Sequence, residues 1–362
     1  MKETFRQTLL SFQNLFAQNK WLWGIVLGVL VSSTLVTYLL GSKLINRPSQ
    51  NLAAPQLQDA QNLPEKAEDL RVLNVLLLGY GGAGHSGGAL SDVIQIMSLD
   101  FEKSQLALIS IPRDLWVSLP NGTQNKINAA YATDLQNQDK KATTAKQMAQ
   151  VVTNLPIDYF IAVDFVGFQR IIGQELGGID VHVAQTMTDD WYPIKGEELN
   201  LCGLSPEEIA KAHEQYSGFE LEKQFPCRFE TISYSAGIVR MEGGDALKYV
   251  RSRHGNPGGD FARGVRQQEV LTAIRDKLFT LEGVINIPRV FAQFAQHTQT
   301  DLDAKLAEYL WPVLKNSRDY QIVRINLSTD NVLTSGTSSG GASIIQPRES
   351  WEAVQQYIQE RL

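Results

Sequence analysis

Cysteine and histidine are scarce in this 362-residue chain, which contains two cysteines and five histidines. Two cysteines cannot build a disulfide scaffold or a four-thiolate zinc site. The histidines lack an HExxH or similar spacing, so we expect no structural metal cage held by histidine and cysteine. A basic excess is also missing, because 33 lysines and arginines face 39 aspartates and glutamates, for a net charge of −6. This balance argues against a protein that coats nucleic acid.

The rest of the composition is typical of a folded globular protein, with 43% hydrophobic and 20% charged residues. One segment stands apart, because Trp21–Ser42 contains no charged residue. As a helix rising about 1.5 Å per residue it would reach roughly 33 Å, enough to cross a bilayer. The alternative is a cleaved signal peptide, but the apolar run is long and no A-x-A-like site follows. We therefore expect residues 1–20 in the cytoplasm, one transmembrane helix at 21–42, and the remainder outside.

Residues 43–70 are polar, rich in glutamine and contain three prolines, which predicts a flexible linker. The two cysteines, Cys202 and Cys227, fall in one irregular, polar stretch. If this part of the chain lies outside the membrane, a disulfide between them is favoured. The opposite orientation would favour two unpaired thiols.

Apolar runs at Val72–Leu78, Val93–Leu99 and Leu106–Ile111 predict buried strands, the last two as an antiparallel pair. Further strands are expected at 157–163, 179–183 and 322–327, and helices at 125–135, 144–155, 165–176, 245–250, 261–281, 287–296, 303–315 and 349–361. Residues 188–233 are expected to be rich in loops, and 335–343 to be a flexible loop. The pattern predicts an α/β fold, a layered α-β-α domain with a mixed, partly antiparallel central sheet.

Residues 79–84 spell GxGxxG directly after a buried strand. A dinucleotide site also requires a helix at this point, within a parallel crossover. Only HSGGALSD separates the motif from the next strand, whereas a crossover needs about a dozen residues, and glycine disfavours a helix. We therefore expect no nicotinamide or flavin site. The loop either brings backbone N–H groups to an anion or is a mobile surface loop.

A cluster of arginines follows the predicted helix 245–250. Arg251 and Arg253 stand two apart and would share one side of an extended backbone, while Asp260, Arg263 and Gln267 have the spacing of one helix face. Arginine binds phosphate oxygens in a bidentate way and stays charged at physiological pH. The cluster therefore suits a pyrophosphate with a divalent cation, and the alternative is a solvated helix with ordinary ion pairs.

Arg113 follows a predicted strand and Pro112, so it is expected to project at the end of the sheet, where ligand clefts often lie. Asp92 begins the neighbouring strand. In a tight antiparallel pair, this carboxylate would approach Arg113. The alternative for Asp92 alone is a turn or capping residue.

Together these segments resemble the LytR-CpsA-Psr family of bacterial envelope proteins. The resemblance covers roughly residues 74–278 and rests on several blocks in order: NVLLLG (74–79), SDVIQIMSLD (91–100), SIPRD (110–114), KINAAYA (126–132), IDYFIAVDFVGF (157–168), LGGIDVHV (176–183), ALKYVRSRH (246–254) and DFARGVRQQ (260–268). It implies a catalytic domain at 71–281, with 195–233 as a cysteine-containing insertion and 282–362 as a C-terminal extension. A single N-terminal span at a bacterial cell membrane, with the domain outside the cytoplasm, agrees with the family's layout.

The resemblance implies a phosphotransferase that moves a glycopolymer from a polyprenyl-pyrophosphate carrier to peptidoglycan, with Mg²⁺ (or Mn²⁺). It implies that the pyrophosphate is held by Arg113, Arg251, Arg253, Arg263 and Gln267. Asp92 would ligate the metal, and Asp260 would orient the arginines or support the metal. The polyprenyl tail needs an apolar channel, for which 160–168 and 171–172 are candidates, with ordinary core as the alternative.

Two positions depart from the family pattern, because Gly81 stands where many members have an acidic residue and Leu90 where many have arginine. His85 or the backbone amides of the loop are candidates to compensate. The departures keep two alternatives open, a polyprenyl-pyrophosphate glycan hydrolase and a non-catalytic envelope protein that binds polyprenyl phosphate or glycan.

Overall fold

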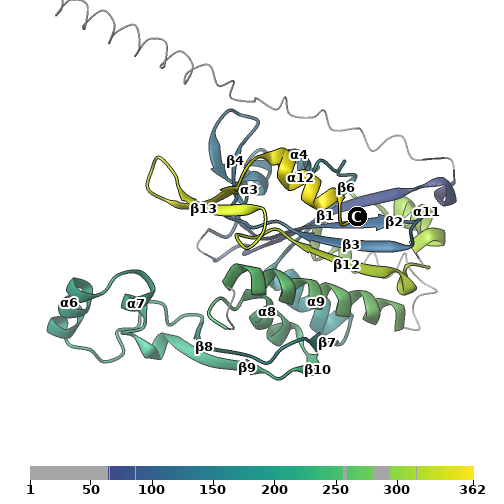
Figure 1. The fold of residues 1–362 in the computed structure, drawn as a ribbon. Coiled ribbons are helices and arrows are strands. Elements are labelled where there is room, and N and C mark those ends of the chain that lie inside the picture. The colour runs from purple at the N-terminus through teal and green to yellow at the C-terminus, as the bar shows by residue number, and fades with distance from the viewer. Residues whose placement is uncertain (1–63, 65, 86, 256–258, 281–293, 315) are drawn as a thin grey trace, which may run out of the picture. The chain divides into compact units, whose positions relative to one another are not determined.

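The structure is a computed structural model that describes residues 64, 66–85, 87–255, 259–280, 294–314 and 316–362 (Figure 1). The chain divides into two units, Met1–Ala53 and Ala54–Leu362, and all described residues belong to the second. The predicted segments 1–20 and 21–42, most of the linker 43–70 and most of the predicted helix 287–296 lie outside the described residues. Within the described ranges, no helix has the length and apolar character needed to cross a bilayer.

A six-stranded sheet forms the centre of the domain, in the order β11-β6-β1-β2-β3-β12. The strands are β1 (Val72–Tyr80), β2 (Ser91–Asp100), β3 (Gln105–Ser110), β6 (Tyr159–Asp164), β11 (Thr298–Thr300) and β12 (Gln321–Asn326). The pairs β1–β2, β2–β3 and β6–β11 are antiparallel, while β1–β6 and β3–β12 are parallel. The predicted mixed sheet is therefore confirmed. Because β2 returns antiparallel to β1, the glycine motif between them opens no parallel crossover.

One face of the sheet is covered by α3 (Ala129–Gln136), α4 (Thr143–Thr153) and α12 (Trp351–Gln359) (Figure 1). A row of paired residues crosses this face from strand to strand, and we call it the core row: Phe160, Leu76, Ile96, Ile109 and Ile325. Each of its side chains is at most 1% exposed. Burial of such aliphatic and aromatic side chains stabilises the fold by about 1.5–3 kcal/mol each.

The opposite face is covered by α9 (Gly259–Thr280) and α11 (Ala304–Leu314). Beyond α9 lies a second apolar core that holds α5 (Phe165–Arg170), a π-helical turn at 171–175 and α8 (Gly243–Arg251). Two small antiparallel sheets complete it, β7 (Ile179–Val183) with β10 (Gly237–Met241) and β8 (Met187–Pro193) with β9 (Phe229–Tyr234). The central sheet thus has helices on both faces, as predicted for a layered α/β domain.

The stretch between β8 and β9 extends from the rest of the domain as a lobe that contains α6 (Pro206–Gln215) and α7 (Gly218–Glu222) (Figure 1). The side chain of Ser205 caps α6 by accepting from Glu208 N, and the Glu208 side chain accepts from Ser205 N in return. A disulfide joins Cys202 to Cys227, the pairing favoured by an outside location. The prediction of loops at 188–233 was incomplete, because paired strands close this stretch and two short helices fill it.

The C-terminal part also corrects the sequence prediction. Residues 335–343 are not a flexible loop but belong to a hairpin of β13 (Leu333–Thr337) and β14 (Ser343–Pro347). Burial of Leu333 and Ile344, together with a bridge from Ile345 to Leu115, provides contacts that the glycine- and serine-rich sequence does not reveal. A second short hairpin, β4 (Trp116–Ser118) with β5 (Gln124–Lys126), occupies the beginning of the helix expected at 125–135, which starts at Ala129 instead.

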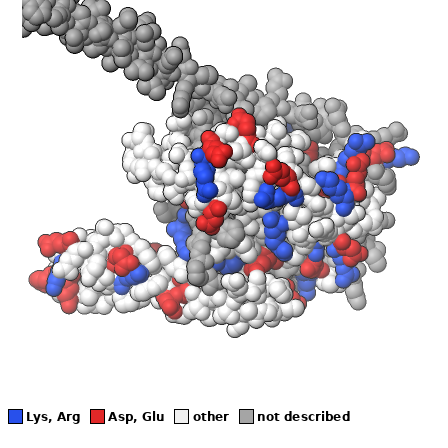
Figure 2. Space-filling view, viewed as in Figure 1, with Lys and Arg blue, Asp and Glu red and all other residues white. Residues whose placement is uncertain are grey.

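Charged side chains of both signs are interspersed over the face in Figure 2, and the α6–α7 lobe carries mainly acidic ones there. The visible surface has no broad field of positive charge.

Candidate functional site

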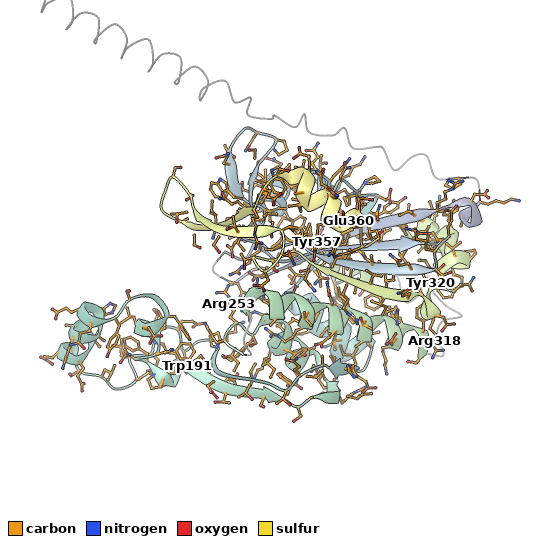
Figure 3. The ribbon with its side chains drawn as sticks, viewed as in Figure 1. Trp191, Arg253, Arg318, Tyr320, Tyr357 and Glu360 are labelled. Carbon is orange, nitrogen blue, oxygen red and sulfur yellow. A yellow bond between two sulfur atoms is a disulfide. The ribbon has the colours of Figure 1, made fainter. Side chains whose placement is uncertain are left out.

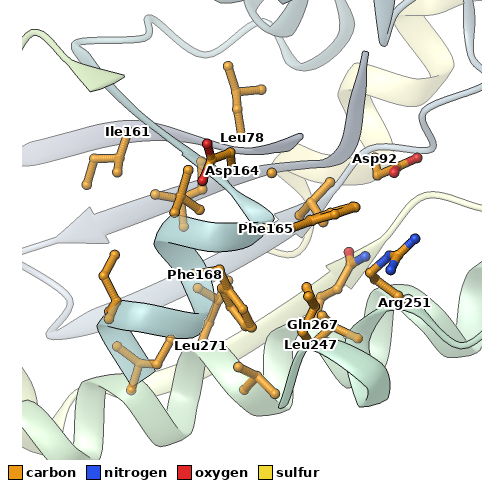
Figure 4. Close-up of a pocket in the computed structure, with 18 of the residues that line it drawn as sticks. Leu78, Asp92, Ile161, Asp164, Phe165, Phe168, Leu247, Arg251, Gln267 and Leu271 are labelled. Atoms are coloured by element: carbon orange, nitrogen blue, oxygen red, sulfur yellow. The ribbon is translucent and has the colours of Figure 1, made fainter. Parts of the chain in front are cut away.

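A cavity of about 1060 Å³ lies between the central sheet and α9. Asp92, Gln267 and Arg251 lie close together at one end, and apolar residues such as Leu271 line the other end (Figure 4). We call the first end the mouth and the mainly apolar remainder the tunnel. The tunnel is lined by aliphatic and aromatic side chains from the sheet, α9, α5 and α11, among them Leu77, Met97, Leu99, Leu106, Ile161, Ile274, Leu278, Leu310 and Trp311.

Strand β6 shows how one segment serves both a core and the tunnel. Successive side chains of a strand point to opposite faces. Phe160 and Ala162 are buried in the core beneath α4, whereas Ile161 and Val163 line the cavity. Only some of the predicted channel residues therefore line the cavity. Phe165, Phe168 and Ile171 also line it, whereas Ile172 is fully buried in the second core.

The mouth brings together the arginines that the sequence singled out. Arg113, Arg251, Arg253, Arg263, Gln267, His85 and Asp92 all line the same cavity. They come from the end of β3, the end of α8, the first turns of α9, the loop after β1 and the start of β2. Side chains that are up to 182 positions apart in the chain thus converge on one cavity.

Arg113 is held in place before any ligand binds. It forms an ion pair with Asp92, as predicted, and its Nε lies 3.4 Å from Asp114 Oδ2. Asp114 also accepts from Lys126 Nζ at 2.6 Å. Burial acts to raise the pKa of Asp114, but the hydrogen bond and charge of Lys126, with the charge of Arg113, lower it below its usual value. The aspartate is therefore ionised and orients both cations.

Helix α9 is positioned over the sheet by a second row of paired residues on the tunnel face, which we call the site row: Ile161, Leu77, Gln95, Ser110 and Asn326. Gln95 Nε2 donates to Gln267 Oε1 at 3.2 Å, and Asn326 Nδ2 donates to Gln268 Oε1 at 3.3 Å. A Cβ at Gly264 would lie 3.0 Å from both Ser110 Oγ and Asn326 Oδ1, so glycine permits the close approach of the helix. These contacts place Arg263 and Gln267 at the mouth.

The turn that carries Arg251 and Arg253 is fixed by two buried charges that the sequence analysis did not single out. Arg266, 3% exposed, donates to the carbonyl oxygens of Tyr249 and Ser252. Asp189, 1% exposed, accepts from Ser252 Oγ at 2.7 Å and from the backbone N–H of His254 at 3.2 Å. Their hydrogen bonds go to groups on either side of Arg251 and Arg253, so they position the turn that carries the two arginines.

Arg251 lies against the wall of the cavity. Its guanidinium carbon is 4.3 Å from the centre of the Phe165 ring, and its Nη1 donates to Tyr192 Oη at 3.5 Å. The ring of His85 meets the edge of the same phenylalanine, with 5.1 Å between ring centres. Burial, and then the positive charges of Arg251 and Lys195, lower the pKa of His85 below its ordinary value of about 6.5. At neutral pH His85 is therefore an uncharged hydrogen-bonding group.

Asp164 is a cavity residue that the sequence analysis missed. It caps α5 by accepting from Gly167 N at 2.7 Å. Gly82 packs against it with φ +78°, and a Cβ on Gly82 would lie 2.9 Å from Asp164 Oδ2. An aspartate directly before a helical pattern is a capping signal that could have identified it.

Aromatic rings from the lobe border the mouth. The rings of Phe219 and His254 stack with 3.8 Å between their centres, and Trp191 contacts Phe219 edge-on. Figure 3 shows Arg253 at the α8–α9 junction and Trp191 where β8 leads into the lobe. The lobe therefore contributes to the wall of the cavity beside the arginine cluster.

The donor set for a metal is small. The described residues contain no group of three or more His, Cys, Asp or Glu that could hold an ion. The side chain of Asp260 lies outside the described residues, although its backbone is part of α9. Asp92 is the predicted ligand and lies at the mouth, 36% exposed. This arrangement fits an ion such as Mg²⁺ only if phosphate oxygens and water complete its coordination, which is how Mg²⁺ is usually bound.

Comparison with known proteins gives matches along most of the chain. A family model described as the LytR_cpsA_psr family matches residues 44–359. The polyisoprenyl-teichoic acid–peptidoglycan teichoic acid transferase TagV of Bacillus subtilis is 27% identical over 268 residues, which are 72% of this chain but 58% of the relative. TagU of Enterococcus faecalis, which carries the same transferase name, is 23% identical over 291 residues, or 79% of this chain and 80% of the relative.

The crystal structure of B. subtilis TagV aligns with a TM-score of 0.55 at 22% identity, covering 81% of this chain and 97% of that chain. This structural likeness shows that the two proteins share a fold.

Proposed function

Because the chain belongs to the LytR-CpsA-Psr family, we propose that it is a phosphotransferase that moves a glycopolymer from a polyprenyl-pyrophosphate carrier to peptidoglycan through a phosphodiester bond. Its relatives TagV and TagU are named as transferases between polyisoprenyl-linked teichoic acid and peptidoglycan.

One observation carries the proposal, the continuity of an apolar tunnel with an arginine-lined mouth in a single cavity. A polyprenyl pyrophosphate has the same two parts, a long apolar tail and a diphosphate. Burying the tail against aliphatic side chains is favourable by about 25 cal/mol per Å² of apolar surface. Each charge-assisted hydrogen bond from an arginine to a phosphate oxygen contributes about 1.5–3 kcal/mol.

The proposed reaction is a displacement at the phosphorus that bears the glycan. The acceptor hydroxyl oxygen forms a bond to this phosphorus, the bond from the phosphorus to the bridging oxygen breaks, and polyprenyl monophosphate leaves with the tail still in the tunnel. The hydroxyl proton passes to water. Arg113, Arg251, Arg253 and Arg263 hold the oxygens on which negative charge develops, and Gln267 donates a neutral hydrogen bond. Asp92 keeps Arg113 aligned before the carrier arrives.

We include Mg²⁺ in the proposal, held by Asp92 together with the diphosphate. When bound, the cation would offset negative charge on the departing phosphate. Chelation with EDTA is expected to reduce transfer, with recovery on addition of Mg²⁺ or Mn²⁺. Transfer at an unchanged rate in EDTA would rule out the metal.

The test uses the purified full-length chain with a labelled polyprenyl-pyrophosphate glycan and peptidoglycan. Arg253 is exposed at the mouth, so Arg253→Ala should leave the fold intact and lower the transfer rate by about 10- to 100-fold, the value of one charge-assisted contact. Arg318→Ala is the matched control, because Arg318 is exposed and lies far from Arg253 (Figure 3). Equal transfer rates in the two variants would contradict the assignment of the site.

Analysis of the products separates the transferase from the hydrolase. A transferase attaches the phosphorylated glycan to peptidoglycan, whereas a hydrolase releases it free even when acceptor is present. A protein that only binds the carrier would yield neither product.

We also propose that Trp21–Ser42 anchors the chain in a bacterial cell membrane with the catalytic domain outside the cytoplasm. The support is the charge-free run and the apolar tail of the proposed carrier. Deletion of residues 1–42 should move the protein from the membrane fraction to the soluble fraction, and a chain that stays soluble with the segment present would contradict the anchor.

A further inference from the structure

A second cavity, of about 420 Å³, adjoins the mouth. Charged residues, among them Asp114, Lys126 and Asp330, line it together with a set of hydroxyl and amide side chains. We name it the hydroxyl-lined cleft after that set: Ser110, Asn326, Ser328, Thr329, Ser335 and Ser343. Strands β3 and β12 are parallel neighbours, so their ends meet at one edge of the sheet, and the β13–β14 hairpin closes the cleft from the side. Ligands of α/β proteins commonly bind at this edge.

The cleft and the large cavity share a wall made of Asp92, Arg113, Arg263 and Gln267. The tunnel lies beneath β6, β1, β2 and the first part of β3, whereas the cleft lies at the ends of β3 and β12, and the two cavities meet at that wall. Gln267 is fixed in the wall by its hydrogen bond to Gln95. A diphosphate held by Arg113 and Arg263 would therefore be approachable from both cavities.

We propose that the hydroxyl-lined cleft binds the acceptor, a carbohydrate, and presents its hydroxyl group to the diphosphate; this rests on the proposed function. Serine, threonine and asparagine side chains both donate and accept hydrogen bonds, as sugar hydroxyls do. The volume of 420 Å³ is near the lower end of ligand pockets, about 300–1,000 Å³, so the cleft holds one end or side group of a glycan.

The positions of the two cavities suit the geometry of phosphoryl transfer. The attacking and leaving oxygens lie roughly in line across the phosphorus. The leaving polyprenyl phosphate departs toward the tunnel, and the cleft gives the acceptor oxygen a separate approach to the same phosphorus past the shared residues. The new bond joins this oxygen to the glycan-bearing phosphorus, the bond to the bridging oxygen breaks, and the hydroxyl proton leaves to water.

The β13–β14 hairpin offers a test with a matched control. Ser335, Ser343 and Ile345 share the hairpin face that lines the cleft, whereas Gln346 points to the other face and is exposed. Ser335→Trp and Ser343→Trp place an indole ring inside the cleft, and Gln346→Trp places the same ring outside it. All three substitutions are made in the full-length chain.

The measurements are binding of a soluble N-acetylhexosamine oligosaccharide and the KM for acceptor in the transfer reaction. The two cleft variants should weaken oligosaccharide binding and raise the acceptor KM about tenfold or more, with carrier affinity unchanged, and Gln346→Trp should match the wild type. Unchanged oligosaccharide binding in both cleft variants overturns the proposal. So does a loss of carrier affinity in them, because the cleft would then belong to the carrier. Failure of the wild type to bind carrier refutes the proposed function instead, while oligosaccharide binding still decides the role of the cleft.

Discussion

The core row and the site row cross the same six-stranded sheet, and every residue of one row is next in sequence to a residue of the other. The core row is apolar throughout and is buried under helices, loops and hairpins on its face. The site row begins with two aliphatic residues on β6 and β1 and continues with three polar ones on β2, β3 and β12. Its apolar end borders the tunnel and its polar end holds α9 and reaches the cleft. The same strand pairing therefore positions both the apolar core on one face of the sheet and the candidate site on the other.

The difference teaches that an apolar side chain in a buried strand has two possible neighbours, another side chain or a ligand. On the core face, close-packed side chains leave no room. On the tunnel face, amide contacts join α9 to the polar end of the site row, and aliphatic residues line the space that remains between the helix and the rest of the sheet.

The largest difference between the two faces is expected in the stability of variants at Leu76 and Leu77, which are adjacent in sequence and lie on opposite faces of the sheet. Leu76 is fully buried, so Leu76→Ala should lower the free energy of unfolding by about 2–5 kcal/mol. Leu77 already borders the cavity, and Leu77→Ala should lower it by only about 1 kcal/mol. Urea denaturation of the two variants measures the difference. Equal losses would mean that the tunnel is packed like the core.

A smaller effect should follow from filling the tunnel. Ile161→Trp adds bulk on the cavity side of β6 and leaves the core side unchanged. Carrier with a long polyprenyl tail should bind about tenfold more weakly or worse, a loss of about 1.4 kcal/mol, because the tail loses room. Inorganic pyrophosphate, which needs the mouth alone, serves as the internal control. If the affinities for both ligands fall equally, the tail does not bind in the tunnel.

The smallest effect concerns protonation at the mouth. The pKa of His85 is lowered by burial and by Arg251 and Lys195, so in the free protein the ring becomes half protonated at a pH below its ordinary pKa of about 6.5. A bound diphosphate brings negative charge and should raise this pKa, so that binding takes up protons and strengthens as pH falls through that range. NMR titration of the His85 ring with and without inorganic pyrophosphate measures the shift, with His85→Gln identifying the signal. A pKa that stays constant would place the anion away from His85.

Much of the sheet and the arginine cluster could be predicted from the sequence. The apolar runs at 72–78, 93–99 and 106–111 are long and bounded by turns, and each is a strand of the central sheet. Arg113, Arg251, Arg253 and Arg263 were singled out because guanidinium groups near strand and helix ends suit phosphate, and the structure brings all four to one cavity. The ion pair between Asp92, at the start of β2, and Arg113, after the end of β3, was predicted from the antiparallel pairing of these strands.

The groups that position this cluster were not predictable in the same way. Gln95 and Gln267 are 172 positions apart, and neither has a local signal that names the other as its partner. Asp189 and Arg266 look like ordinary surface charges in the sequence, and only the tertiary fold buries them beside Ser252. The β13–β14 hairpin was missed because its glycines and serines have low strand propensity, which packing against Leu115 overrides.

The disulfide-closed lobe has a consequence for how such a protein can diversify. Helix α6 buries only Ala212 and α7 buries no residue, so the lobe depends little on a core of its own. The Cys202–Cys227 crosslink and the capping of α6 restrain it locally instead. Substitutions on its outer surface can therefore accumulate at little cost to the domain. Because Phe219 reaches from this lobe to His254, drift at the inner edge of the lobe would alter the surface beside the mouth while leaving the arginine cluster intact.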